Sequence, residues 1–181
     1  MARASRPSKI KGFFRAAPVR FTVKLVIAAV VAASLFLNLY TYVTPVVRYF
    51  GTSMAPTLSD GQILVVCKPA AVRAGDLVAF YYNNSILVRR VVATGNQQVA
   101  IDIFGNVSVN GEVLDEPYAA DKTLGQCDLP FPYNVPANSY FVLGDDRDSA
   151  MDSRLADIGA ISEDQIVGKV ILSLNPLKTI S

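Results

Sequence analysis

A serine in a short segment framed by glycine and proline is the first residue that could do covalent chemistry. Ser53 lies in Gly51–Leu58, which reads Gly-Thr-Ser-Met-Ala-Pro-Thr-Leu and begins shortly after a long apolar stretch. A serine hydroxyl becomes a nucleophile when a neighbouring base takes its proton. The segment alone also fits an ordinary turn with a solvated hydroxyl, so the choice depends on the rest of the chain.

The composition limits which base could serve Ser53. The 181 residues include no histidine, which excludes a Ser-His-Asp triad, a Cys-His pair and a His-ligated zinc site. The two cysteines, Cys67 and Cys127, are too few for a four-cysteine zinc site. They fit two separate half-buried thiols, although an oxidising compartment would allow a bridge. An acid–base role at neutral pH must come from a carboxylate, a perturbed lysine or a tyrosine.

Positive charge is concentrated at the start of the chain. Residues 1–24 hold seven of the 17 basic residues and no acid, which leaves ten basic residues and all 15 acids for residues 25–181. This later part therefore has a net charge of −5. The basic arm adjoins an apolar segment, so a membrane surface explains it better than nucleic acid, which we do not expect as a partner.

The stretch Leu25–Val43 contains no charged residue and is long enough for one membrane-spanning helix. Tyr40 and Tyr42 lie at its far end, where interfacial aromatic residues are common. The preceding positive charges favour a cytoplasmic N-terminus. We therefore predict a basic cytoplasmic segment at 1–24, a transmembrane anchor at 25–47 and an extracytoplasmic domain at 48–181. A cleavable signal peptide is the rival interpretation, although the apolar run exceeds a usual signal core.

The remaining sequence predicts a mainly β domain. Asn110-Gly111 between alternating residues is a strong hairpin signal. Short β-branched and aromatic runs predict strands at 62–66, 76–82, 86–93, 106–114, 139–143 and 165–174. Residues 115–137 are rich in Pro, Asp and Gly and predict a long loop. Many short strands with turn signals indicate a barrel-like or sandwich-like fold.

Four segments together resemble the type I signal peptidase family, including its conjugative pilin-processing branch. They are Gly51–Leu58, Ala74–Val78 (Ala-Gly-Asp-Leu-Val), Val88–Asn96 (Val-Arg-Arg-Val-Val-Ala-Thr-Gly-Asn) and Leu143–Arg154 (Leu-Gly-Asp-Asp-Arg-Asp-Ser-Ala-Met-Asp-Ser-Arg). The resemblance implies a single N-terminal transmembrane helix and an all-β catalytic domain with an SH3-like core. It implies no cofactor and no metal.

The resemblance also implies an activity and site residues. Such enzymes cut exported preproteins after small residues, just outside the bacterial inner membrane, with a serine nucleophile and a lysine base. Their partners are signal peptides or a pilin-like precursor, the lipid bilayer and the secretion translocon. Ser53 matches the nucleophile, and its backbone N–H would help to form the oxyanion hole. Gly51 stands where many members have a hydroxyl donor. Charged residues of the supporting network match Arg90, Asp145, Asp152 and Arg154.

Two positions depart from the family pattern. Arg89 stands where the family has its general-base lysine, and Ala150 stands where it has a serine that hydrogen-bonds this lysine. Arginine is not deprotonated in proteins, so Arg89 can hold geometry or stabilise an oxyanion but cannot accept the serine proton. Asp145 or a lysine brought close by the fold remains open as the base.

Two functional hypotheses follow, with a purely structural anchor as a weaker third. One is an active membrane-bound serine endopeptidase. The other is a catalytically impaired binding or assembly protein with the same fold, in which Arg89 pairs with a carboxylate. The acidic run at 145–152 could also suggest calcium, but it lacks the glycine and glutamate of an EF-hand loop. Structural Asp–Arg pairing explains this run better.

Overall fold

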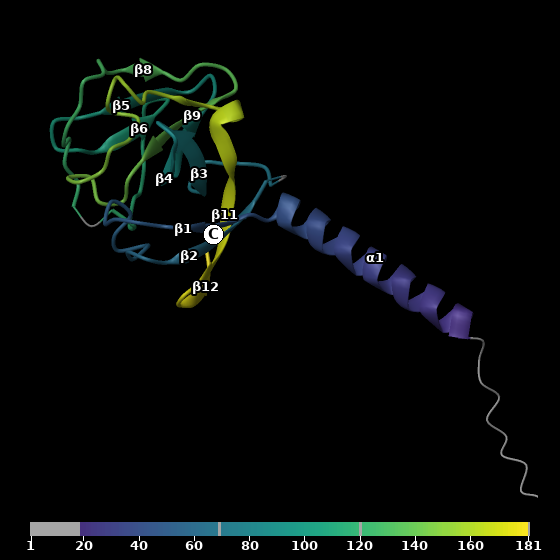
Figure 1. The fold of residues 1–181 in the computed structure, drawn as a ribbon. Coiled ribbons are helices and arrows are strands. Elements are labelled where there is room, and N and C mark those ends of the chain that lie inside the picture. The colour runs from purple at the N-terminus through teal and green to yellow at the C-terminus, as the bar shows by residue number, and fades with distance from the viewer. Residues whose placement is uncertain (1–18, 69, 120, 181) are drawn as a thin grey trace, which may run out of the picture. The chain divides into compact units, whose positions relative to one another are not determined.

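The computed structural model describes residues 19–68, 70–119 and 121–180, and it separates into two units. The first unit contains most of helix α1 (Val19–Val43) and the second comprises residues 41–181 (Figure 1). Residues 21–38 within α1 are long and apolar enough to cross a membrane. Most of the predicted basic segment, residues 1–18, lies outside the described residues.

The predicted anchor extends too far at its C-terminal end. Helix α1 ends at Val43, and Val46 and Val47 lie in strand β1 (Val46–Arg48), which pairs antiparallel with strand β2 (Ile63–Cys67). Pro45 has no N–H to continue a helix, and its carbonyl accepts a hydrogen bond from Val66 N at 2.9 Å. The two β-branched valines that follow favour a strand.

Two antiparallel sheets form the second unit, as far as the described residues show (Figure 1). The larger has eight strands in the order β1-β2-β11-β3-β4-β9-β10, with β12 paired to β11. The smaller has four in the order β7-β6-β5-β8. The further bounds are β3 (Leu77–Tyr82), β4 (Ser85–Thr94), β5 (Gln98–Ile101), β6 (Val107–Val109), β7 (Glu112–Val113), β8 (Tyr133–Asn134), β9 (Ser139–Leu143), β10 (Ile161–Ser162), a 3₁₀ turn η1 (Glu163–Gln165), β11 (Ile166–Leu174) and β12 (Leu177–Thr179).

The mainly β fold predicted from the sequence is confirmed, and the six predicted strand regions all contain strands. The Asn110-Gly111 turn joins β6 to β7, with positive φ at both residues. The long predicted loop contains only the short strand β8. Strands β1, β5, β10 and β12 were not predicted, because runs of two to four residues carry too little alternation to stand out.

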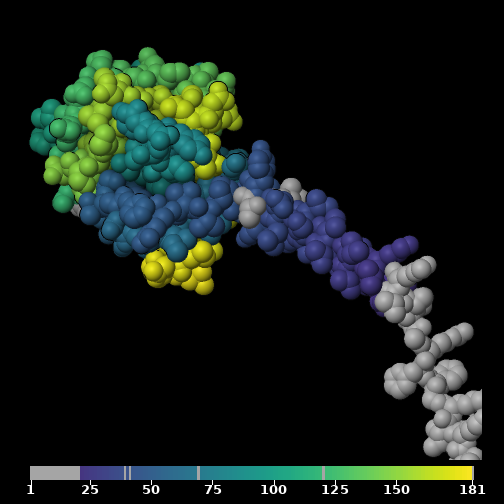
Figure 2. All heavy atoms as spheres, in the orientation of Figure 1, coloured from purple at the N-terminus to yellow at the C-terminus, as the bar shows by residue number. Residues whose placement is uncertain are grey.

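The core of this unit is built from aliphatic and aromatic side chains of strands distant in the sequence. Buried residues from β2, β3, β4 and β11 form one cluster with Tyr49, Met54 and Leu58 of the segment between β1 and β2. In Figure 2 the atoms of this early segment lie beside those of the C-terminal strands on the surface of the unit. Both ends of this unit therefore support the Ser53 segment.

Candidate active site

Ser53 lies in a tight turn whose apolar neighbours are anchored in the core. Ala55 N donates to Thr52 O at 2.7 Å and Leu58 N donates to Met54 O at 2.9 Å, which closes the turn. Met54 and Leu58 are buried, whereas Ser53 is half-buried. The turn thus holds the Ser53 backbone rigidly and leaves its side chain at the edge of the core.

The hydroxyl of Tyr49 is the side-chain group found in contact with Ser53. Tyr49 Oη lies 3.3 Å from Ser53 Oγ, and it also accepts a hydrogen bond from Met54 N at 2.9 Å. Tyr49 is 3% exposed and follows β1 directly. Tyrosine is one of the residue types that the composition allows as a base, but no pattern in the sequence singles out Tyr49.

The Arg89 side chain, which extends from β4, is held by two backbone carbonyls. Nε donates to Met151 O at 2.8 Å, and Nη1 donates to Val88 O at 2.6 Å. Burial lowers the pKa of the Arg89 guanidinium, the charges of Asp152 and Tyr49 raise it, and Arg154 lowers it. The guanidinium still carries its proton at ordinary pH. Arg89 therefore brings a fixed positive charge to the neighbourhood of Tyr49.

Arg90 and Asp145 form a buried, bidentate ion pair. Arg90 Nε and Nη2 donate to Asp145 Oδ1 and Oδ2 at 2.9 and 2.6 Å. Thr57 Oγ1 also donates to Asp145 Oδ2, and Arg90 Nη1 donates to the carbonyl of Gly75 at 2.8 Å. The guanidinium of Arg90 lies 4.0 Å from the ring centre of Tyr118. The pair therefore links the Ser53 segment, through Thr57, to β4 and to the segment after β9.

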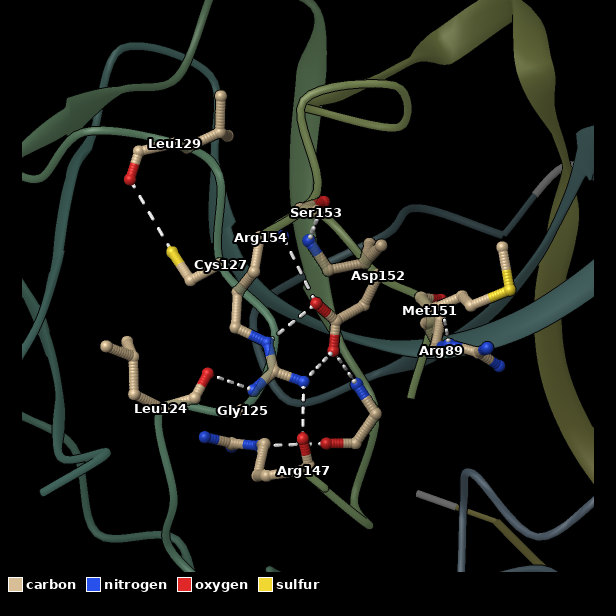
Figure 3. A network of polar contacts seen from close by, with 12 residues as sticks. Arg89, Leu124, Gly125, Cys127, Leu129, Arg147, Met151, Asp152, Ser153 and Arg154 are labelled. Carbon is tan, nitrogen blue, oxygen red and sulfur yellow. Dashed lines mark hydrogen bonds and ion pairs between the residues drawn. The ribbon is translucent and has the colours of Figure 1, made fainter. Parts of the chain in front are cut away.

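Asp152 and Arg154 form a second buried pair in the same loop (Figure 3). Arg154 Nε and Nη2 each donate to Asp152 at 2.9 Å, and Asp152 Oδ2 accepts from Gly144 N at 3.0 Å. Arg154 Nη2 also donates to Arg147 O at 2.7 Å. These contacts close residues 144–154 into a rigid loop, which we call the acidic loop.

The acidic loop packs directly on the Ser53 backbone. Asp146 N donates to Ser53 O at 3.1 Å. A Cβ atom placed on Gly144 would lie 2.7 Å from Ser53 O and 2.2 Å from the Ala150 Cβ, so no larger residue fits there. Gly144 is thus a second residue of the site that no pattern in the sequence indicated. Ala150 fills the position beside it with a methyl group.

The structure therefore brings most of the predicted site residues into two connected networks. Arg90 pairs with Asp145, and Asp152 pairs with Arg154. Gly51 stands in the same turn as Ser53 with φ +102°, a conformation that favours glycine, and its N–H donates to Asp60 Oδ1 at 2.7 Å. Thr57 and Tyr118 were missed because neither belongs to a charged pattern in the sequence.

Three other candidates for a base, Lys169, Lys68 and Asp145, contact other side chains. Lys169 Nζ pairs with Asp76 at 2.7 Å, and Lys68 lies over the ring of Tyr42. Asp145 is enclosed by Arg90 and Thr57. Within the described ranges, no group of three or more His, Cys, Asp or Glu side chains is placed to hold a metal ion. Cys67 and Cys127 are half-buried free thiols.

Comparison with known proteins identifies the family. The family described as signal peptidase, peptidase S26, matches residues 20–174. The chain belongs to this signal peptidase family. Signal peptidase IB of Staphylococcus aureus is 35% identical to it over 66% of this chain and 72% of that protein. Signal peptidase I of Bacillus caldolyticus is 34% identical over 78% of this chain and 84% of that protein.

A solved signal peptidase I from Enterococcus faecalis also matches, with a TM-score of 0.48 and 23% sequence identity. The match covers 55% of this chain and 97% of that one. Family membership, which the sequence resemblance predicted, is confirmed by the family match and by the relatives. A signal peptidase is a peptidase and therefore a hydrolase, which sets the chemistry to be tested against the site.

Proposed function

We propose that the protein is a membrane-bound serine endopeptidase that removes N-terminal signal peptides from exported preproteins after small residues. The observation that carries this proposal is the placement of Ser53 on a rigid turn with the acidic loop packed on its backbone. Fixed positioning of a nucleophile is a large part of what an acyl-transfer site must provide. The relatives named signal peptidase support the substrate class.

In the proposed reaction, Ser53 Oγ attacks the scissile carbonyl carbon and forms an acyl-enzyme. The N–H of Ser53 finds no acceptor among the described residues, so it is free to stabilise the developing oxyanion. Gly51 adds no hydroxyl donor there. The pairs Arg90–Asp145 and Asp152–Arg154 support the site by fixing Thr57 and the acidic loop.

The proposed setting is the bacterial inner membrane, with one spanning helix and the N-terminus in the cytoplasm. Helix α1 contains a stretch of suitable length and composition. The basic residues at 1–24 favour a cytoplasmic N-terminus. The domain would then act in the periplasm or outside the cell on signal peptides or a pilin-like precursor, beside the lipid bilayer and the secretion translocon.

One observation favours a second candidate function, a signal-peptidase-like binding or assembly protein with impaired catalysis. The side chain at position 89 is an arginine that donates to two backbone carbonyls, so it cannot serve as a base. Such a protein would hold a signal peptide without cutting it. The two functions differ in one measurable product, the cleaved preprotein.

The test uses the full chain purified in detergent and a preprotein with small residues before the cleavage site. The mass of the products is followed for the wild type, for Ser53→Ala and for the matched control Ser59→Ala, whose exposed side chain lies six residues away on the same segment. Endopeptidase function predicts one cut made by the wild type and Ser59→Ala and lost in Ser53→Ala. Peptide binding without a cut would establish the binding protein instead.

A further inference from the structure

We propose that Tyr49 is the proton acceptor for Ser53, in place of the lysine that Arg89 replaces. The inference rests on the proposed function, because it names the base of that same site. It concerns a residue that belongs to none of the four segments that resemble the family. Tyr49 would be a catalytic residue, since its hydroxyl contacts the reacting oxygen of Ser53.

The geometry around Tyr49 suits a proton acceptor. Its hydroxyl oxygen lies 3.3 Å from Ser53 Oγ, a contact that can tighten when substrate binds. The same oxygen accepts a hydrogen bond from Met54 N at 2.9 Å, which fixes it and stabilises negative charge on it. The ring is buried among core residues, so the hydroxyl has little freedom to move away.

Fixed positive charge lies near the Tyr49 hydroxyl. The charges of Tyr49 and Arg89 interact, so a phenolate at position 49 and the guanidinium at position 89 stabilise one another. Behind Arg89 lie Asp152 and Arg154, which already neutralise each other. Two further charged residues near Tyr49 in the sequence have other partners. Arg48 lies over the ring of Phe50, and Asp60 accepts a hydrogen bond from Gly51 N. The core residues packed with Tyr49 from β2, β3, β4 and β11 are apolar: Leu64, Val66, Leu77, Ala79, Val88, Val167 and Val170.

This arrangement gives Arg89 a role that its chemistry allows. An arginine cannot take the Ser53 proton, but it can stabilise an anionic neighbour that does. With arginine in place of lysine, the base is Tyr49, directly after β1, and Arg89 in β4 keeps its positive charge. The methyl group of Ala150 fits the same account, because there is no lysine left for a hydroxyl at that position to bind.

A single proton passes between Ser53 and Tyr49 during acylation. The Tyr49 phenolate takes the proton of Ser53 Oγ–H while Oγ forms a bond to the scissile carbonyl carbon and the C=O π electrons move to the carbonyl oxygen. When the C–N bond breaks, the neutral phenol gives this proton to the departing amine. In deacylation, the phenolate takes a proton from the attacking water, and the phenol returns it to Ser53 Oγ as the acyl bond breaks.

The experiment measures the reactivity of Ser53 without a peptide. The full chain in detergent is treated with a fluorophosphonate, and labelling at Ser53 is followed by mass between about pH 7 and pH 10. We expect a wild-type labelling rate that increases with pH, because free phenols ionise near pH 10. Tyr49→Phe should label about 100-fold more slowly and lose this increase, in line with the usual effect of removing a general base. The control Tyr81→Phe, on the exposed face of β3, should behave as the wild type.

Replacement of Tyr49 by 3-fluorotyrosine keeps the ring and the hydroxyl but makes the phenol more acidic. The inference predicts that the pH–rate profile then moves to lower pH, an effect that a structural role for the ring would not produce. It is overturned if this profile does not move, if Tyr49→Phe labels at the wild-type rate, or if wild-type Ser53 is not labelled. Preprotein cleavage separates the two proposals. Labelling that depends on Tyr49, without any cleavage, contradicts only the proposed function, whereas cleavage that Tyr49→Phe leaves unchanged contradicts only this inference.

Discussion

Arg89 Nε donates to the backbone carbonyl of Met151 at 2.8 Å, which ties β4 to the acidic loop. The bond fixes the cation and connects it to the loop that also packs on Ser53. Arg89 therefore has a structural and electrostatic place in the site even though it cannot take a proton.

Arg89→Lys should increase preprotein cleavage at neutral pH by about tenfold or more. A lysine enclosed at this largely buried position would have its pKa lowered by desolvation and could serve as a base. The double variant Arg89→Lys/Ala150→Ser should increase it further, because the added hydroxyl can hold the amine. Steady-state rates at pH 7 check this, with Ala150→Ser alone as the control that should give no increase. A decrease in both lysine variants would show that the guanidinium itself is needed.

Asp145→Asn should destabilise the domain by about 3–5 kcal/mol, the usual cost of breaking a buried ion pair from one side. Asp145 is fully buried, and its loss would leave the Arg90 charge without its carboxylate. Denaturant unfolding of the detergent-solubilised protein measures this, with Asp157→Asn as an exposed control in the segment just after the acidic loop. Equal unfolding midpoints for the two variants would contradict the structural role of the pair.

Gly144→Ala should reduce activity strongly and cost about 1–3 kcal/mol of stability through overpacking. The added methyl would overlap the Ala150 side chain and press on the Ser53 carbonyl oxygen. Gly144→Ala/Ala150→Gly removes only the first of these contacts. We therefore expect the double variant to regain stability while activity stays low. Full recovery of activity in the double variant would show that the packing on Ser53 is unimportant.

The hydrogen bond from Ser149 Oγ, at 2.6 Å, holds the pKa of the Asp146 carboxyl below its ordinary value of 3.8, with help from the backbone N–H groups of Asp148 and Ser149. Because the folded-state pKa is lowered, this bond stabilises the fold above pH 3.8, and the effect is lost as pH falls through the folded-state value. Ser149→Ala should cost under about 1 kcal/mol at pH 7, since Asp146 is only half-buried and solvent screens its charge. Unfolding measured at pH 7 and near pH 2 should show a larger difference at pH 7. An equal difference at both values would point to a cause other than ionisation.

The sequence predicted the long strands and the paired charges well because each depends on local or strongly patterned residues. Ser53 and the motif at 143–154 stand out from residue types, whereas the departure at Arg89 depends on the resemblance to the family and stays a prediction. Tyr49 could not, because its role depends on the direction of one hydroxyl that the fold turns toward Ser53. Gly144 was missed for a similar reason, since the space for a Cβ is set by two segments about 90 residues apart.

The end of the predicted anchor shows what hydropathy alone could not predict. Apolar composition continued through Val46 and Val47, so hydropathy extended the predicted span to residue 47. In the structure, however, these residues pair with β2 and form a strand. Apolar composition indicates which residues could lie in a membrane. Strand pairing also depends on partner residues elsewhere in the chain, which composition does not indicate.

The central claim is that Ser53 is the nucleophile of a working peptidase, and a single-turnover reaction tests it most directly. Enzyme in detergent is mixed in excess with a preprotein, and the acyl-enzyme and the released mature chain are followed by mass. We expect an adduct on the peptide that contains Ser53, followed by the mature chain, and neither product with Ser53→Ala. Cleavage that persists in Ser53→Ala, or a wild type that binds the preprotein and never cuts it, would contradict the account.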